Sequence, residues 1–125
     1  MKLRFARHTN NLEKIKAFYI DLLGLELLGG FENHNNYDGI FIGKPNLEWH
    51  LEFTKSNESV KFNFGKEDYL VFYPENEIEY DTIINRIAKN NINFRASKNV
   101  YWNENGKLIL DPEGFGIIVS NLKTI

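Results

Sequence analysis

The sequence predicts an α+β fold in which a strand–helix–three-strand unit, βαβββ, occurs twice along one chain. Short runs of alternating apolar and polar residues, typical of half-buried strands, surround two segments whose apolar residues recur at helical spacing. The segment DGIFIGKPNLEWHLEF in the first half also runs parallel to NGKLILDPEGFGIIVS in the second half, with Pro45 and Pro112 in equivalent turns. Two homologous modules explain both observations, and we expect them to form a curved mixed sheet around a cleft.

The first module is predicted at residues 1–56. Alternation over residues 2–8 indicates a strand, and Asn11 is a typical N-cap for the helical pattern that follows and stops at Gly24. Three more strands, separated by the turn-forming segments HNN and GKPN, are expected at residues 25–31, 37–43 and 47–54.

The second module is predicted at residues 66–125, after a polar connector that carries no sign of a flexible linker. It repeats the order of the first, with a helix at residues 78–89. Its strands are expected at residues 69–73, 94–96, 107–111 and 115–121, the last two joined by the DPEG turn. We therefore expect residues 1–125 to form a single domain.

Composition narrows the classes of function. A chain of 125 residues that is 42% hydrophobic can bury one core without disulfides, and it contains no cysteine for a thiol nucleophile or a Cys-based zinc site. The net charge of −2, with both signs interspersed, argues against nucleic-acid binding. No segment has the length of a membrane span, and the absence of cysteine fits a reducing compartment, so we expect a cytoplasmic protein without a membrane partner.

Several motifs occur together and in order: AFYIDLLGLELL after the first strand, WHLEFT, NVYWNENG, and DPEGFGIIV at the last strand. In this arrangement the whole chain resembles the vicinal oxygen chelate superfamily of glyoxalases, bleomycin-resistance proteins and extradiol dioxygenases. More closely, it looks like an uncharacterised bacterial subfamily of that group. The resemblance implies the glyoxalase-like fold, a small molecule bound in the cleft, and a homodimer.

The resemblance also implies where a metal would bind, because metal-dependent members usually take four ligands from the first and last strands of each module. In this sequence those positions fall on Arg4, Glu52, Asp68 and Ile118. Arginine stays protonated in proteins and isoleucine has no donor atom, so neither can bind a cation. Glu52 is retained and Asp68 is ambiguous. We therefore expect no metal of the family type and no other cofactor.

The alternation of side chains along the strands allows one alternative metal site. His8, His50 and Glu52 are expected on the cleft face, where two histidines and a carboxylate would suit iron or zinc. In that case the protein would be a metal-dependent lyase, isomerase or dioxygenase using Glu52 with His50 or His8. The alternative is that both histidines are hydrogen-bonded residues of the cleft or its rim.

Other polar and aromatic residues have two interpretations each. Arg4 either pairs with Glu52 in place of the metal or binds a carboxylate or phosphate of a ligand. His34, in the NHNN segment, is either a general acid or base or a solvated turn residue. Tyr101 and Trp102 suit a cleft lip that stacks on a flat ligand, and equally a hydrophobic plug or a dimer contact.

The function expected from these observations is binding of an unidentified small molecule in the cleft, without the family metal. The metal-dependent enzyme is the alternative, with Glu52 and His50 as catalytic candidates, and a dimeric scaffold with a vestigial cleft is a third. The candidate ligand-binding residues are Arg4, His8, His34, His50, Glu52, Asp68, Tyr101 and Trp102.

Overall fold

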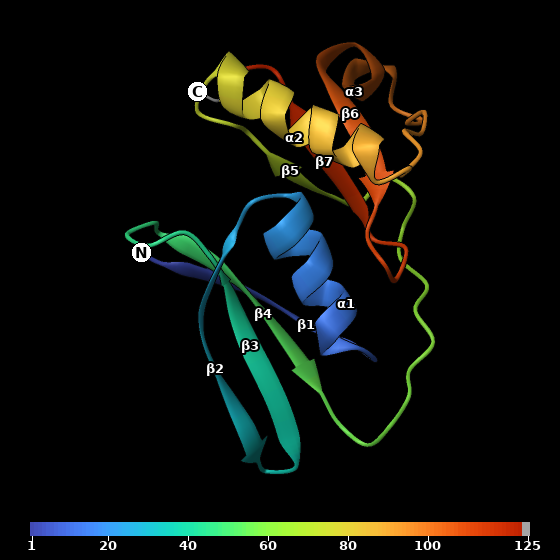
Figure 1. The fold of residues 1–125 in the computed structure, drawn as a ribbon. Coiled ribbons are helices and arrows are strands. Elements are labelled where there is room, and N and C mark those ends of the chain that lie inside the picture. Colours follow the sequence, from blue (N-terminus) through green and yellow to red (C-terminus); the bar gives the residue numbers. More distant parts are fainter. Residues whose placement is uncertain (124–125) are drawn as a thin grey trace. The chain divides into compact units, whose positions relative to one another are not determined.

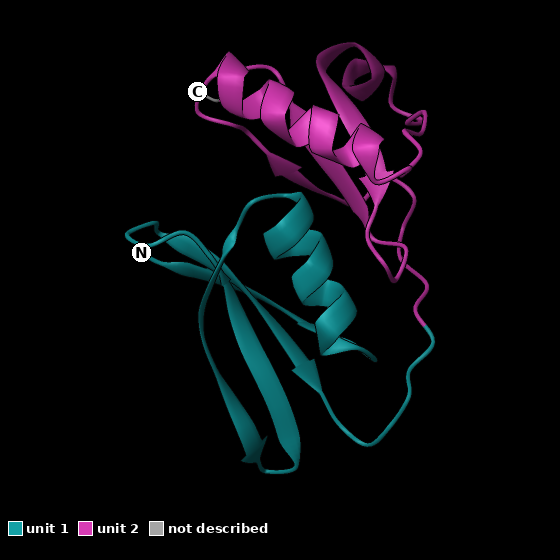
Figure 2. Cartoon of the chain, viewed as in Figure 1, with its two compact units in different colours: residues 1–61 teal, residues 62–125 magenta. Residues whose placement is uncertain are grey.

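The computed structural model describes residues 1–123 and divides the chain into two compact units, which meet in sequence at Lys61 and Phe62 (Figure 2). This boundary lies in the connector predicted between the modules. Residues 124–125 of the predicted second module lie outside the described residues. Each unit combines a mixed sheet with helices, which confirms the α+β fold class (Figure 1).

The first unit contains a four-stranded sheet in the order β1-β4-β3-β2. Its central strands are β4 (Trp49–Lys55) and β3 (Tyr37–Gly43), which pair antiparallel; the bounds of β3 are those that the sequence predicts. Strand β1 (Leu3–His8) pairs in parallel with β4, and β2 (Glu26–His34) pairs antiparallel with β3. The parallel pair requires a crossover connection, which the intervening helix begins.

The helix of the first unit starts where the sequence predicts, because the Asn11 side chain accepts a hydrogen bond of 3.0 Å from the Lys14 amide. It begins as α1 (Leu12–Lys16) and continues as the π-helical η1 (Ala17–Leu22). The predicted helix is therefore present, but its second half holds more than 3.6 residues per turn. Gly24 ends the helix with φ of +85°.

The two faces of the first sheet differ in what covers them. Tyr19 of η1 packs on Phe53 of β4 with ring centroids 4.9 Å apart, and Arg7 of β1 donates a hydrogen bond of 3.2 Å to the Tyr19 hydroxyl. The helix therefore covers the face that carries Arg7 and Phe53. Side chains alternate along each strand, so Arg4 and Glu52 lie on the opposite face, called here the helix-free face.

A tight hairpin joins β2 to β3. His34 pairs with Tyr37, and the two residues between them, Asn35 and Asn36, have φ of 52° and 70°. Two consecutive positive φ values are the mark of a type I′ turn, which matches the twist of the flanking strands. The sequence prediction ended this strand at residue 31, but β2 continues to His34, so the connection to β3 is shorter than predicted.

Within the described part of the second unit, three strands form a sheet in the order β5-β7-β6. Strand β7 (Gly116–Ser120) pairs in parallel with β5 (Tyr69–Phe72) and antiparallel with β6 (Gly106–Leu110). Helix α2 (Glu77–Lys89) is the counterpart of α1. The DPEG turn has Gly114 at φ of +90°, two residues after Pro112, and the KPN turn has Asn46 at φ of +68°, one residue after Pro45, so both turns use left-handed backbone but at positions one residue apart.

The strand predicted at residues 94–96 is not formed, and only an isolated bridge between Arg95 and Leu108 remains. The side-chain amide of Asn103 accepts a hydrogen bond from the Ser97 N–H at 2.6 Å and donates one to the Ser97 carbonyl at 2.9 Å. Both backbone groups of Ser97 are thus taken, so no strand ladder can continue past residue 96. It enters helix α3 (Val100–Asn105) instead.

Each unit has its own apolar core. In the first unit the helix and the helix-covered sheet face bury Ile15, Phe18, Tyr19, Leu22, Ile40, Ile42, Leu51 and Phe53. In the second unit α2 and the sheet bury Ile83, Ile87, Leu108, Ile109, Ile117, Ile118 and Val119. Among residues 1–123, no helix is both long and apolar enough to cross a membrane.

The type I′ turn makes a prediction about stability. Asn36→Ala is expected to lower the free energy of unfolding by about 1 kcal/mol, because a Cβ-bearing residue without a polar side chain is strained in left-handed backbone. Asn36→Gly is the matched control, and it should preserve or raise stability because Asn-Gly is the favoured pair for this turn. Urea unfolding measures both, and equal stability of the two variants would contradict the assigned turn.

Candidate functional site

Three of the predicted site residues, Arg4, His50 and Glu52, meet on the helix-free face of the first sheet. The register of β1 with β4 makes Arg4 and His50 partners and places Glu52 opposite Ala6, one position further along the same face. The Nε of Arg4 donates a hydrogen bond of 2.8 Å to Nε2 of His50, and Nη1 of Arg4 lies 3.6 Å from Oε2 of Glu52. The predicted pairing of Arg4 with Glu52 is thus present, and His50 shares the same guanidinium.

The hydrogen bond from Arg4 defines the state of the His50 ring. A guanidinium has only donors, so Nε2 of His50 must be the acceptor and can carry no proton. The neutral ring then has its proton on Nδ1, which makes that atom a donor. Neither Nδ1 of His50 nor Nη2 of Arg4 has a hydrogen-bond partner among residues 1–123.

Phe41 of β3 completes the group, and the sequence analysis missed it. Its ring lies beneath the guanidinium of Arg4, with Cζ 4.7 Å from the ring centroid, and the edge of the His50 ring contacts it at a centroid distance of 5.9 Å. Such a cation–π contact contributes about 0.5–1 kcal/mol at an exposed site. Alternation in GIFIG would have revealed it, because Phe41 points away from the buried Ile40 and Ile42.

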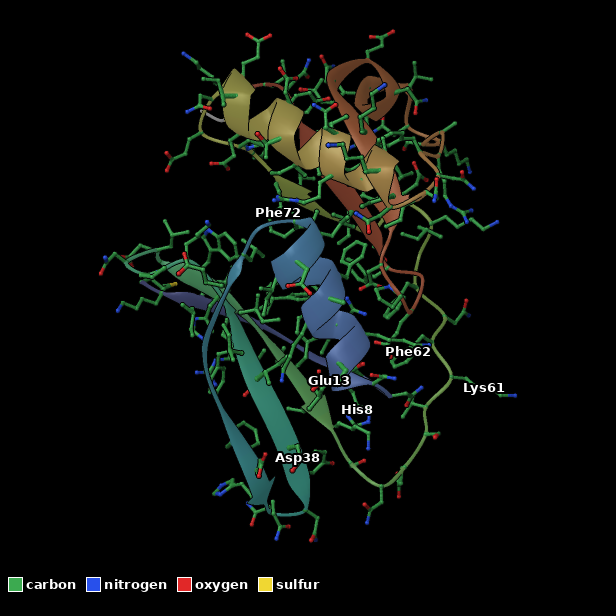
Figure 3. All side chains as sticks on the ribbon, in the orientation of Figure 1. His8, Glu13, Asp38, Lys61, Phe62 and Phe72 are labelled. Atoms are coloured by element: carbon green, nitrogen blue, oxygen red, sulfur yellow. The ribbon has the colours of Figure 1, made fainter. Side chains whose placement is uncertain are left out.

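His8 lies on the same face but not in the same group. It pairs with Thr54, four residues beyond His50 along β4, which separates the two histidines by about 13 Å at 3.3 Å per residue. Its Nδ1 lies 3.5 Å from Oγ1 of Thr54, and its ring meets Tyr37 edge-on with centroids 6.2 Å apart. Figure 3 shows His8 where β1 ends, beside the start of α1.

The remaining predicted residues lie elsewhere. His34 is exposed at the end of β2, with its ring 6.0 Å from that of Phe31. Asp38, near the tip of the same hairpin in Figure 3, accepts a hydrogen bond from the Asn33 amide rather than from His34. Asp68 belongs to the second unit, where it is exposed just before β5, and Tyr101 and Trp102 contact each other on α3.

The donor set is informative about metal binding. Within residues 1–123, no group of three or more His, Asp or Glu side chains is placed to hold a metal ion. The lone pair of His50 that could bind a metal accepts a hydrogen bond from Arg4 instead, and the permanent charge of Arg4 lies beside Glu52. Ile118, at the fourth position that the resemblance implies, is fully buried in β7.

Comparison with known proteins identifies the family. A family model described as the YycE-like N-terminal domain matches residues 3–54, and one described as the YycE-like C-terminal domain matches residues 67–121. Protein YycE of Bacillus subtilis strain 168 is 36% identical over 125 residues, which cover 99% of this chain and 90% of that protein. The chain belongs to the YycE-like family.

Solved structures agree with this YycE-like assignment. A crystal structure of a YycE protein of unknown function from Bacillus subtilis has a TM-score of 0.85 and 35% identity, over 99% of this chain and 91% of that one. Trypanothione-dependent glyoxalase I of Leishmania major has a TM-score of 0.75 and 17% identity, over 97% and 86%. TnmS3, an antibiotic-binding protein of Streptomyces sp. CB03234, has a TM-score of 0.66 and 18% identity, over 96% and 93%. The predicted resemblance to the vicinal oxygen chelate superfamily is therefore confirmed at the level of the fold.

The exposure of Arg4 predicts that its pairing with Glu52 contributes little to folding. Because 49% of the Arg4 side chain is exposed, Arg4→Gln should lower the free energy of unfolding by less than about 1 kcal/mol. Urea unfolding of the variant beside the wild type measures this. A loss above about 2 kcal/mol would instead make the group a structural ion pair, because only a desolvated pair costs that much to break.

Proposed function

We propose that this YycE-like protein binds a small molecule at the helix-free face of its first sheet, anchored by Arg4 and without a divalent metal. The observation that carries the proposal is the arrangement of the Arg4 guanidinium. Its Nε and Nη1 are held by His50 and Glu52, while Nη2 has no partner among residues 1–123. A guanidinium fixed in this way is pre-organised to bind a ligand because little side-chain freedom remains to be lost.

The residues present argue against a metal in this group. A divalent cation would have to displace Arg4 from both His50 and Glu52 and then tolerate the guanidinium nearby, since arginine cannot lose its charge. Only His50 and Glu52 would remain as ligands, and metal sites generally use three or more. The local charges already balance without a cation.

The relatives by fold support two classes of function. TnmS3 is an antibiotic-binding protein, in line with binding without turnover, while glyoxalase I is an enzyme. The metal-dependent enzyme, whether lyase, isomerase or dioxygenase, draws its support from His50 and Glu52 lying two residues apart on one face of β4. We favour binding because Arg4, the residue of β1 that contacts both His50 and Glu52, is a permanent cation.

The remaining expectations belong to the same proposal. By resemblance to the superfamily we propose a homodimer that acts in the cytoplasm, where a chain without cysteine needs no oxidising environment. Sedimentation velocity across a concentration series tests the dimer. A species with the mass of one chain at every concentration would contradict it.

A ligand screen by thermal shift tests the binding proposal. Compounds that raise the melting temperature of the wild type should lose most of that effect in Arg4→Gln, because a stabilising shift reports binding to the native state. Arg95→Gln, which removes an exposed arginine of the second unit, is the matched control and should keep the response. Compounds that stabilise Arg4→Gln as strongly as the wild type would contradict the proposed anchor.

A second experiment concerns the metal. We expect Arg4→His to gain a rise in melting temperature with zinc or nickel, because it would place an imidazole beside His50 and Glu52. The wild type should show no such rise, and adding Glu52→Gln to Arg4→His should weaken it. Stoichiometric metal in the purified wild type, removed by Glu52→Gln, would overturn the proposal in favour of the enzyme.

A further inference from the structure

We infer that the ligand of this site is a planar aromatic acid, a flat ring system carrying a carboxylate or a similar oxyanion. The inference rests on the proposed function and adds the chemical class of the ligand. It follows from two features that lie side by side on the helix-free face. One is an aromatic floor that suits a flat apolar body, and the other is a set of donors without partners that suits an anionic end.

The floor is the aromatic surface of Phe31 and Phe41 on neighbouring strands, whose ring centroids lie 6.0 Å apart with the ring planes tilted by 51°, so a flat molecule can lie parallel to only one of the two rings. Gly39 makes room for it, because a Cβ built at that position would collide with the ring of Phe31. Phe31 therefore lies against the sheet instead of standing away from it. Both rings are half-buried. Because the guanidinium of Arg4 covers one face of Phe41, a flat molecule would stack on the exposed surface of Phe31 and on the outer face of the guanidinium.

The donors lie at the Phe41 end of this floor. Arg4 offers Nη2, and the tautomer of His50 makes its Nδ1 a donor as well. Nη2 of Arg4 can donate to one oxygen of a carboxylate, and such charge-assisted bonds are about twice as strong as neutral ones. The outer face of the guanidinium, opposite Phe41, also suits an aromatic ring.

The negative charge of Glu52 repels an anionic ligand, so the exposure of its side chain must be compared with that of Arg4. Its side chain is 15% exposed, against 49% for Arg4. A ligand that approaches the face therefore meets the guanidinium more directly than the carboxylate. Glu52 therefore reduces the affinity for an anion, but its side chain is too little exposed to anchor a cationic ligand in place of Arg4.

His50 has a positioning role in this account. Its Nε2 holds Nε of Arg4 at 2.8 Å, which fixes the guanidinium plane over Phe41 and leaves Nη2 available. Without an acceptor at that position, Arg4 would keep only the looser contact of 3.6 Å to Glu52 and its cation–π contact with Phe41. Loss of His50 should therefore weaken recognition of the anion even though His50 need not touch it.

The test uses three probes of matched shape: 2-naphthoate, its neutral analogue 2-naphthamide, and the saturated decahydronaphthalene-2-carboxylate. Titrations followed by ¹H–¹⁵N NMR give the dissociation constants. We expect naphthoate to bind the wild type about tenfold more tightly than naphthamide, which is the ratio expected from one charge-assisted pair. It should also bind about threefold more tightly than the saturated acid, which cannot stack.

Variants separate the parts of the site. Arg4→Gln should abolish the preference for naphthoate over naphthamide, and Phe31→Leu, at a ring that does not contact Arg4, should abolish only the preference for the aromatic acid over the saturated one. His50→Leu should reduce the preference for the anion, and His50→Gln, which restores an acceptor, should recover much of it. A purely structural role of His50 would weaken all three probes alike.

The outcomes distinguish this inference from the proposed function. If the thermal-shift screen yields ligands that depend on Arg4 while naphthoate binds no more tightly than naphthamide, the ligand class is wrong and the proposed site remains. If no ligand depends on Arg4, both are wrong. Equal binding of naphthoate to the wild type and to Arg4→Gln would likewise overturn the inference.

Discussion

Arg4 faces His50 because β1 and β4 pair in parallel with these two residues as partners, and the polar chemistry of the helix-free face depends on this alignment. A slip of one residue would turn every side chain of β1 to the other face and bury Arg4 against the helix. The register is held by the residues of the opposite face, where Arg7 reaches Tyr19 and Phe53 packs on the same ring. The core of the first unit therefore fixes the position of its candidate site.

The two units share a topology, but corresponding strands carry different kinds of residue. In the first unit, β4 presents His50 and Glu52, half-buried, on the helix-free face. In β7, the corresponding strand of the second unit, all five residues are buried and include Ile117, Ile118 and Val119. Among the described residues, the equivalent strand has thus become part of an apolar core. The two halves share topology while differing in the chemistry that each strand presents.

Much of this arrangement could be predicted from the sequence, because local patterns carry it. Alternation and turn residues gave the bounds of β3 and the positions of the other strands in the first unit, and resemblance singled out Arg4 and Glu52. Alternation assigns a face but not a position along it. His8 was therefore grouped with His50, although the strand register separates them by about 13 Å.

The other differences have long-range causes that no local pattern contains. The sequence predicts a strand at residues 94–96, but only an isolated bridge at Arg95 forms. The Asn103 side chain hydrogen-bonds to both backbone groups of Ser97, and the chain then enters α3. The bond from Arg4 to His50 joins residues 46 positions apart, so the tautomer of His50 could not be inferred before the strands were placed. Phe41 is the exception, since alternation alone would have assigned it to the helix-free face.

The most direct test of this account is the tautomer of His50, read from long-range ¹H–¹⁵N correlations of its imidazole ring at mildly alkaline pH. The hydrogen bond from Arg4 predicts a proton on Nδ1 and none on Nε2, a preference that should be lost in Arg4→Gln. A proton on Nε2 in the wild type would contradict the account, because Nε of Arg4 would then have no acceptor at Nε2 of His50 and the guanidinium would lose the closer of its two polar contacts.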